Sequence, residues 1–160
     1  MHRRNDYRYS HTDRFGIVYV PDHFAPYELL PKDFYNEHKH SGNLIWVCFD
    51  IGLLRSADLI RKRYGKMTAN DWKWGGRNHN RGYRHFDCGM GATLSQHKFG
   101  RAVDLIPDNV TAEEIREDIK NNPNCRDFKR IMCIEDGVDW LHIDTRNWYK
   151  DVYGLKVVTH

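Results

Sequence analysis

Two polar segments that lie far apart in the sequence constrain the fold of this chain more than any other feature. Residues 95–104 read Ser-Gln-His-Lys-Phe-Gly-Arg-Ala-Val-Asp, and residues 139–144 read Asp-Trp-Leu-His-Ile-Asp. His97, Asp104 and His142 together offer two imidazoles and one carboxylate. That is the number of protein ligands in a catalytic zinc site, where the fourth position stays open. The fold therefore has to bring the two segments together.

The residues around these three side chains indicate how they can converge. Gly100 lies between the first two and allows a sharp backbone turn, so that both can face one point. Alternation along a predicted strand at 140–144 places His142 and Asp144 on one face. Asp144 is therefore a candidate for orienting the His142 ring. Asp139 precedes that histidine by three residues, so it has to occupy the turn before the strand, or a bulge, to act as a base in the same site.

Helices and short strands are mixed in this chain without a regular strand–helix alternation. Apolar residues from Asp50 to Tyr64 recur at helical spacing, and Gly65 ends the helix. Thr111 and Glu114 have the spacing of a capping box, which predicts a helix at 111–121. Strands are expected at 66–70, 103–106, 130–134 and 140–144. The pattern predicts an α+β fold with a single domain at 23–160, a mostly antiparallel sheet flanked by helices, and a polar N-terminal arm at 1–22.

Composition narrows the class of protein. The 160 residues include 25 Lys and Arg against 22 Asp and Glu, a net charge of +3 that is too small for the basic surface of a nucleic-acid-binding protein. No apolar run approaches the ~20 residues that cross a bilayer, and the charged opening lacks the apolar core of a signal peptide. We expect a monomer without nucleic-acid partners or membrane insertion, made in the cytoplasm without a signal peptide.

Other candidate functional residues lie between the helix and the first histidine segment. Trp72 and Trp74 precede a glycine pair in a polar stretch, where tryptophans either line a binding cleft or pack over the edge of the core. Both possibilities remain open from the sequence. His79, His85 and Cys88 are close enough in sequence to form a rival metal cluster.

Three motifs resemble those of one peptidase family. Residues 95–104 fit the pattern Ser-x-His-x-x-Gly-x-Ala-x-Asp, which is similar to the signature of the D-alanyl-D-alanine carboxypeptidase family. Residues 139–142 resemble its acid-x-x-His motif, and residues 81–84, Arg-Gly-Tyr-Arg, resemble its Ser-Gly-Tyr-Arg segment. The resemblance extends over about 24–144. The family includes resistance dipeptidases, bacterial wall endopeptidases and phage endolysins, and it shares its fold with the hedgehog signalling domain.

The resemblance implies a set of site residues. Zinc would be held by His97, Asp104 and His142, with Asp139 as general base. Arg84 would polarise the scissile carbonyl or bind a substrate carboxylate, although a structural ion pair is the alternative for this residue. The implied or candidate substrate-binding residues are Ser95, Trp74 and Tyr83. The sequence departs from the family pattern in two places, with Arg81 instead of serine and Asp139 instead of the commoner glutamate.

The implied activity is zinc-dependent hydrolysis of peptide bonds in peptidoglycan stem peptides, as carboxypeptidase or endopeptidase. The lack of a signal peptide favours a phage or prophage enzyme that reaches the cell wall after release or as part of a virion. Two alternatives have the same fold. One is a non-catalytic, zinc-bearing binding or structural module, and the other is a cytoplasmic D-alanyl-D-alanine dipeptidase.

Overall fold

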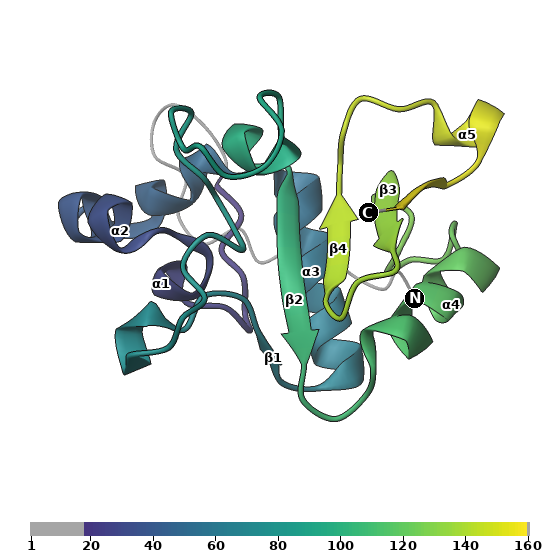
Figure 1. Ribbon diagram of the computed structural model, residues 1–160, viewed down its shortest axis with the longest axis horizontal. Helices are drawn as coiled ribbons and strands as arrows, with labels where there is room; N and C mark the ends of the chain where they lie inside the picture. The colour runs from purple at the N-terminus through teal and green to yellow at the C-terminus, as the bar shows by residue number, and fades with distance from the viewer. Residues whose placement is uncertain (1–17, 160) are drawn as a thin grey trace, which may run out of the picture.

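A five-stranded sheet with the order β1-β2-β4-β3-β5 lies at the centre of the fold (Figure 1). The computed structural model describes residues 18–159. Within them, β2 pairs antiparallel with β1 and β4, β4 pairs antiparallel with β3, and β5 pairs in parallel with β3. The strands are β1 (Met67–Thr68), β2 (Ala102–Pro107), β3 (Cys133–Asp136), β4 (Leu141–Asp144) and β5 (Lys156–Thr159). The predicted α+β single domain is confirmed, with a sheet that is mixed because of β5.

Helices surround this sheet. Figure 1 shows α3 behind β2 and β4, with α1 and α2 to the left of β2 and α4 beside β3. The α-helices are α1 (Pro26–Leu29), α2 (Lys32–His38), α3 (Ile51–Tyr64), α4 (Ala112–Asn121) and α5 (Lys150–Tyr153), and the 3-10 helices are η1 (Gly42–Cys48), η2 (Trp72–Trp74) and η3 (Gln96–Phe99). Among the described residues, no helix combines the length and the apolar character that crossing a bilayer requires.

The two long helices match the predictions to within one residue. The Asp50 side chain accepts a hydrogen bond from the backbone N–H of Leu53 and caps α3, and Gly65 ends the helix with a φ of +91°. At the start of α4, Thr111 and Glu114 form the predicted capping box. The strand expected at 130–134 is observed at Cys133–Asp136, because the buried Ile131 closes a turn by donating its backbone N–H to the carbonyl oxygen of Phe128. The parallel strand β5 was not predicted.

The pairing of β2 with β4 decides which side chains share a face. Asp104 lies directly opposite His142, and Ala102 lies opposite Asp144. Opposed residues of an antiparallel pair point to the same face, with Cβ atoms about 5 Å apart. The alternate residues point to the other face, where α3 packs, and none of them is exposed; they are Val103, Leu105, Leu141 and Ile143. Polar side chains therefore occupy one face of the central strands, and the core occupies the other.

Gly100 makes the turn from η3 into β2 possible. Its φ is +64°, and a Cβ at this position would lie 1.8 Å from the carbonyl oxygen of Cys48. The Gly100 carbonyl also accepts a hydrogen bond from the backbone N–H of Asp50 at 2.9 Å. Both the left-handed backbone and the close approach require glycine. The expectation that a glycine turns the backbone between His97 and Asp104 is confirmed.

Replacing Gly100 with alanine is expected to lower the free energy of unfolding by about 2–5 kcal/mol, because left-handed strain of about 1–2 kcal/mol adds to the cost of overpacking. Gly75→Ala is the matched control, since Gly75 has a φ of +80° but no atom within 4 Å of an added Cβ. Urea denaturation of both variants measures the difference. Equal losses would show that the contact with Cys48 has no energetic consequence.

The last residues of the expected polar arm, 18–22, pack against α3, whereas the rest of the arm lies outside the described residues. The Tyr19 hydroxyl donates to the Asp58 carboxylate at 2.9 Å. The backbone N–H groups of Asp22 and His23 donate to the same carboxylate at 3.1 and 2.7 Å. Asp58 is buried, so these contacts join the start of the domain to the helix behind the sheet.

Candidate metal centre

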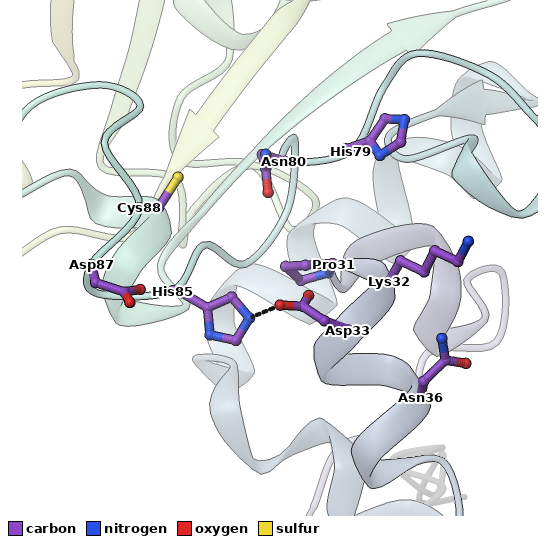
Figure 2. Close-up of a pocket in the computed structure, with 9 residues that line it drawn as sticks. All are labelled: Pro31, Lys32, Asp33, Asn36, His79, Asn80, His85, Asp87 and Cys88. Atoms are coloured by element: carbon purple, nitrogen blue, oxygen red, sulfur yellow. Dashed lines mark ion pairs between the residues drawn. The ribbon is translucent and has the colours of Figure 1, made fainter.

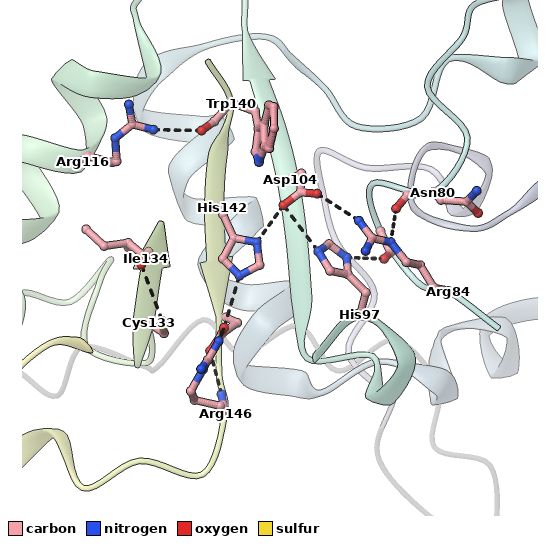
Figure 3. A network of polar contacts seen from close by, with 12 residues as sticks. Asn80, Arg84, His97, Asp104, Arg116, Cys133, Ile134, Trp140, His142 and Arg146 are labelled. Atoms are coloured by element: carbon pink, nitrogen blue, oxygen red, sulfur yellow. Dashed lines mark hydrogen bonds and ion pairs between the residues drawn. The ribbon is translucent and has the colours of Figure 1, made fainter. Parts of the chain in front are cut away.

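Three of the predicted site residues converge on the polar face of the central strands. His97 comes from η3, Asp104 from β2 and His142 from β4, and all three are buried. One ligating atom of each lies within 4.8 Å of the other two. Asp104 Oδ1 is 2.7 Å from His142 Nδ1 and 3.4 Å from His97 Nε2 (Figure 3). The cross-strand register explains this convergence, because it places Asp104 and His142 opposite each other.

The hydrogen bonds of the two histidines fit metal coordination. His97 Nδ1 lies 2.7 Å from the carbonyl oxygen of Gly82, and a carbonyl only accepts, so the proton of the neutral ring belongs on Nδ1. His142 Nε2 lies 3.2 Å from Asp144 Oδ2, which likewise favours the proton on Nε2. When a metal is bound, the nitrogens that face Asp104 would then present lone pairs to it. Two such nitrogens and a carboxylate oxygen are a donor set that zinc accepts.

The charges at the centre stabilise one another. Burial raises the pKa of Asp104, but hydrogen bonds from His142 and His97 outweigh it and hold that pKa well below its usual range. Burial lowers the pKa of His142, whereas its hydrogen bonds to Asp104 and Asp144 raise it, with a net result of about 9. Without a metal, a proton on the His142 ring therefore offsets part of the negative charge of the two carboxylates. A divalent cation would supply the same compensation.

Asp144 occupies the orienting position that the strand pattern predicted. It is fully buried, and its Oδ2 contacts His142 Nε2. Arg146 binds the same carboxylate through Nε, at 2.9 Å from Oδ1 and 3.0 Å from Oδ2. Burial raises the pKa of Asp144, but the hydrogen bonds from His142 and Arg146 lower it further than burial raises it. An ionised Asp144 fixes the ring of His142 and strengthens it as a ligand.

Arg84 approaches the second oxygen of the Asp104 carboxylate. Its Nη2 lies 3.3 Å from Asp104 Oδ2, and its Nε donates to the carbonyl oxygen of Asn80 at 2.6 Å. Arg84 is buried, and burial lowers its pKa from the ordinary value. The structural ion pair is therefore present. It turns Asp104 so that Oδ1 faces the histidines, which makes Arg84 a positioning residue for a ligand.

Asp139 lies in the turn between β3 and β4, as its spacing from His142 required. Its side chain is exposed, and within residues 18–159 it makes no hydrogen bond or ion pair. The turn itself is held from both sides by Arg116, which donates to the carbonyl oxygens of Val138 at 3.0 Å and Trp140 at 2.9 Å. A rigid backbone therefore carries a free carboxylate next to the ligand strand.

Sequence reasoning missed Arg116. This residue lies on α4 and is buried, together with Ala112, Ile115 and Ile119 on the same face. The signal was present, because an arginine in the apolar stripe of an amphipathic helix needs buried partners. Those partners are carbonyl groups on another segment, and the sequence does not identify them.

The three predicted substrate-binding residues lie in three different environments. Ser95 directly precedes η3. A Cβ added to Gly91 would lie 3.8 Å from Ser95 Oγ and 3.0 Å from Arg84 Nη1, so both side chains border the same point. Ser95 therefore lies close to Arg84. The Tyr83 ring packs in an aromatic cluster, with centroid distances of 5.1 Å to Phe34 and 6.2 Å to Phe49. Ring packing is thus its observed role.

The sequence left two roles open for the tryptophans of η2, packing over the edge of the core or lining a binding cleft, and the two residues differ in this respect. Trp72 Nε1 donates to the carbonyl oxygen of Leu30 at 2.9 Å, so this ring is tied to the edge of the core. Trp74 is 64% exposed and touches Tyr27 edge-on at 5.4 Å. Trp74 therefore remains available to a ligand, but the structure does not bring it to the three metal-ligating residues.

His79, His85 and Cys88 line a surface pocket without forming a metal site (Figure 2). His85 Nε2 instead pairs with the Asp33 carboxylate at 3.1 Å. Among residues 18–159, the ligand group described above is the one set of three or more His, Cys, Asp or Glu side chains that converges closely enough for a metal ion. The pocket also includes Asn80, whose carbonyl binds Arg84.

Comparison with known proteins gives no assignment for this chain. No protein-family model, no curated protein and no solved structure matches it. The chemistry of the site is therefore the basis for a functional assignment, because function resides in specific residues rather than in the fold class.

Proposed function

We propose that this chain is a zinc-dependent peptidase that hydrolyses bonds in peptidoglycan stem peptides, with the hedgehog/DD-peptidase type of fold. The observation that carries the proposal is the convergence of His97, Asp104 and His142, with the outer nitrogen of each histidine bound to a fixed oxygen. Its resemblance to D-alanyl-D-alanine carboxypeptidases supports the choice of substrate. The enzyme would act on the cell wall after release from the cell or as part of a virion.

In the proposed mechanism, different residues of the chain have different roles. When bound, zinc would polarise the scissile carbonyl and activate a water molecule. Asp139 takes a proton from the attacking water and passes it to the leaving amine, a role that contributes about 10²–10⁴ in rate. Arg84 holds Asp104 in place, and Asp144 holds His142. Arg116 holds the turn that carries Asp139 through its hydrogen bonds to the carbonyl groups of Val138 and Trp140.

The decisive experiment is mass spectrometry of muropeptides after digestion of purified sacculi. We expect new stem-peptide fragments with the zinc-loaded protein, loss of these fragments with a chelator, and their recovery when zinc is restored. The masses identify the bond that is cut. Sacculi that remain intact with zinc-loaded protein would refute the proposal.

A non-catalytic, zinc-bearing module is the second candidate. The contact between Arg84 and Asp104 favours it. In an active site this arginine would point at the substrate, whereas here it forms a structural ion pair. Such a module would bind sacculi in sedimentation assays without releasing amino groups. A protein that cleaves free D-alanyl-D-alanine but leaves sacculi intact would instead be a dipeptidase.

Replacing Arg116 with lysine is expected to lower kcat about 10- to 100-fold. Arg116 reaches the carbonyl oxygens of Trp140 and Val138 with two different nitrogens, and a single ammonium does not reproduce this fork, so the base is misplaced. KM and zinc affinity should remain unchanged, since Arg116 is buried and contacts none of the three metal-ligating residues. Glu113→Gln is the control, because it removes the exposed partner of Arg116 and leaves the two carbonyl contacts. A lysine variant with normal kcat would show that the clamp is purely structural.

A further inference from the structure

We infer that Arg81 determines substrate specificity by binding a carboxylate of the peptide close to the bond that is cut; this inference rests on the proposed function. Arg81 is half-buried and is fixed at several points. Its backbone N–H donates to Asn70 Oδ1 at 2.9 Å, and its side-chain Nε donates to Asn78 Oδ1 at 2.8 Å. Its guanidinium carbon lies 5.0 Å from the ring centroid of Trp140. The cation is therefore immobilised before any substrate arrives.

This cation lies beside the metal centre. The Arg81 carbonyl oxygen accepts a hydrogen bond from the backbone N–H of Asp104 at 2.7 Å, so the two residues are direct neighbours across the edge of β2. Trp140 precedes His142 by two residues, and Figure 3 shows its ring on the side of the central strands that carries the Asp104 and His142 side chains. Trp140 also adjoins Asp139, the proposed base. A group bound by the guanidinium over this ring would thus lie within a short reach of the reacting bond.

The remaining donors of Arg81 match a carboxylate. Within residues 18–159, its Nη1 and Nη2 groups have no hydrogen-bond partner and the guanidinium pairs with no carboxylate. Arg84, by contrast, already uses its charge on Asp104. A planar guanidinium with two free amino groups binds a carboxylate through parallel hydrogen bonds, with more strength and directionality than a neutral amide acceptor allows. Stacking on tryptophan leaves this fork free.

Two sources of such a carboxylate exist in a stem peptide, and paired probes distinguish them. One pair is diacetyl-L-lysyl-D-alanyl-D-alanine and its C-terminal amide. The other pair is L-alanyl-γ-D-glutamyl-L-lysine with a free or an amidated α-carboxyl group on the glutamyl residue. For at least one pair, we expect the zinc-loaded protein to favour the acid over the amide about 10- to 100-fold in KM, with similar kcat. The pair that shows the preference identifies the source.

Arg81→Gln tests the assignment, because glutamine keeps the length and polarity but removes the charge. It should raise KM for the acid to the value for the amide and leave kcat unchanged, whereas Arg81→Lys should keep part of the preference. Arg77→Gln is the matched control, since Arg77 is an exposed arginine of the same loop. An unaltered acid-to-amide ratio in Arg81→Gln, or a wild-type protein without preference in either pair, would overturn the inference.

The same four peptides also separate this inference from the proposed function. If zinc-loaded wild-type protein cuts none of them, calorimetric dissociation constants replace KM as the measurement. Preferential binding of an acid that is lost in Arg81→Gln would support the role of Arg81 while counting against a peptidase. Equal binding of acid and amide would overturn the inference.

Discussion

Replacing Asp104 with asparagine is expected to abolish zinc binding and peptidase activity together. The carboxylate lies between both histidines and is the one anionic donor of the ligand group. Losing a partner behind a ligand typically costs 10–100-fold in metal affinity, so losing a ligand should cost more than about 100-fold. Equilibrium dialysis with zinc measures the affinity, and release of stem-peptide fragments from sacculi measures the activity.

Two further variants keep this prediction testable if Asp104→Asn folds poorly, as it leaves the buried Arg84 without its counter-charge. His97→Gln removes a ligand while its amide can still donate to the Gly82 carbonyl. Asp108→Asn is the control, because this exposed aspartate after β2 pairs with Lys66 rather than with the site. Normal zinc affinity in both ligand variants would place the metal elsewhere.

Replacing Asp139 with asparagine is expected to lower kcat about 10²–10⁴-fold while zinc binding stays normal. The amide has the size of the carboxylate but cannot accept the proton of the attacking water. Because the Asp139 side chain is exposed, the free energy of unfolding should change by less than about 0.5 kcal/mol. Zinc stoichiometry, thermal unfolding and the rate of fragment release separate these effects.

Asp151→Asn is the matched control for this substitution, because Asp151 is an exposed aspartate on α5. Its activity should equal that of the wild type. Asp139→Glu should retain part of the activity, since it keeps the carboxylate and lengthens the side chain. Full activity in Asp139→Asn would exclude Asp139 as the base and favour another proton acceptor.

Local signals in the sequence predicted the parts of the fold that depend on local interactions. The capping residues Asp50 and Thr111 and the terminal Gly65 set the bounds of the two long helices, because each acts on backbone groups within a few residues. The parallel pairing of β5 with β3 escaped prediction, because Lys156–Thr159 gains its partner from a segment more than twenty residues away. Strand pairing of this kind depends on tertiary packing rather than on propensity.

The same distinction between local signals and long-range contacts holds for the candidate site. The sequence predicted the ligand group and the orienting role of Asp144, since motif spacing and strand alternation determine the face of each side chain. It left the partner of Arg84 open and did not indicate the contacts of Arg116 or the stacking of Arg81 on Trp140. These are contacts between cations and groups on distant segments, for which neither periodicity nor composition gives a signal.

The register of β2 against β4 has a consequence for how the protein acquires its metal during synthesis. Asp104 and His142 become neighbours only when the later strand docks on the earlier one, 38 residues further along the chain. A nascent chain that ends before this strand has at most two of the three ligands and no rigid site. High-affinity metal uptake therefore reports that the central strands have assembled, and a zinc-sensitive dye added during refolding would time that step.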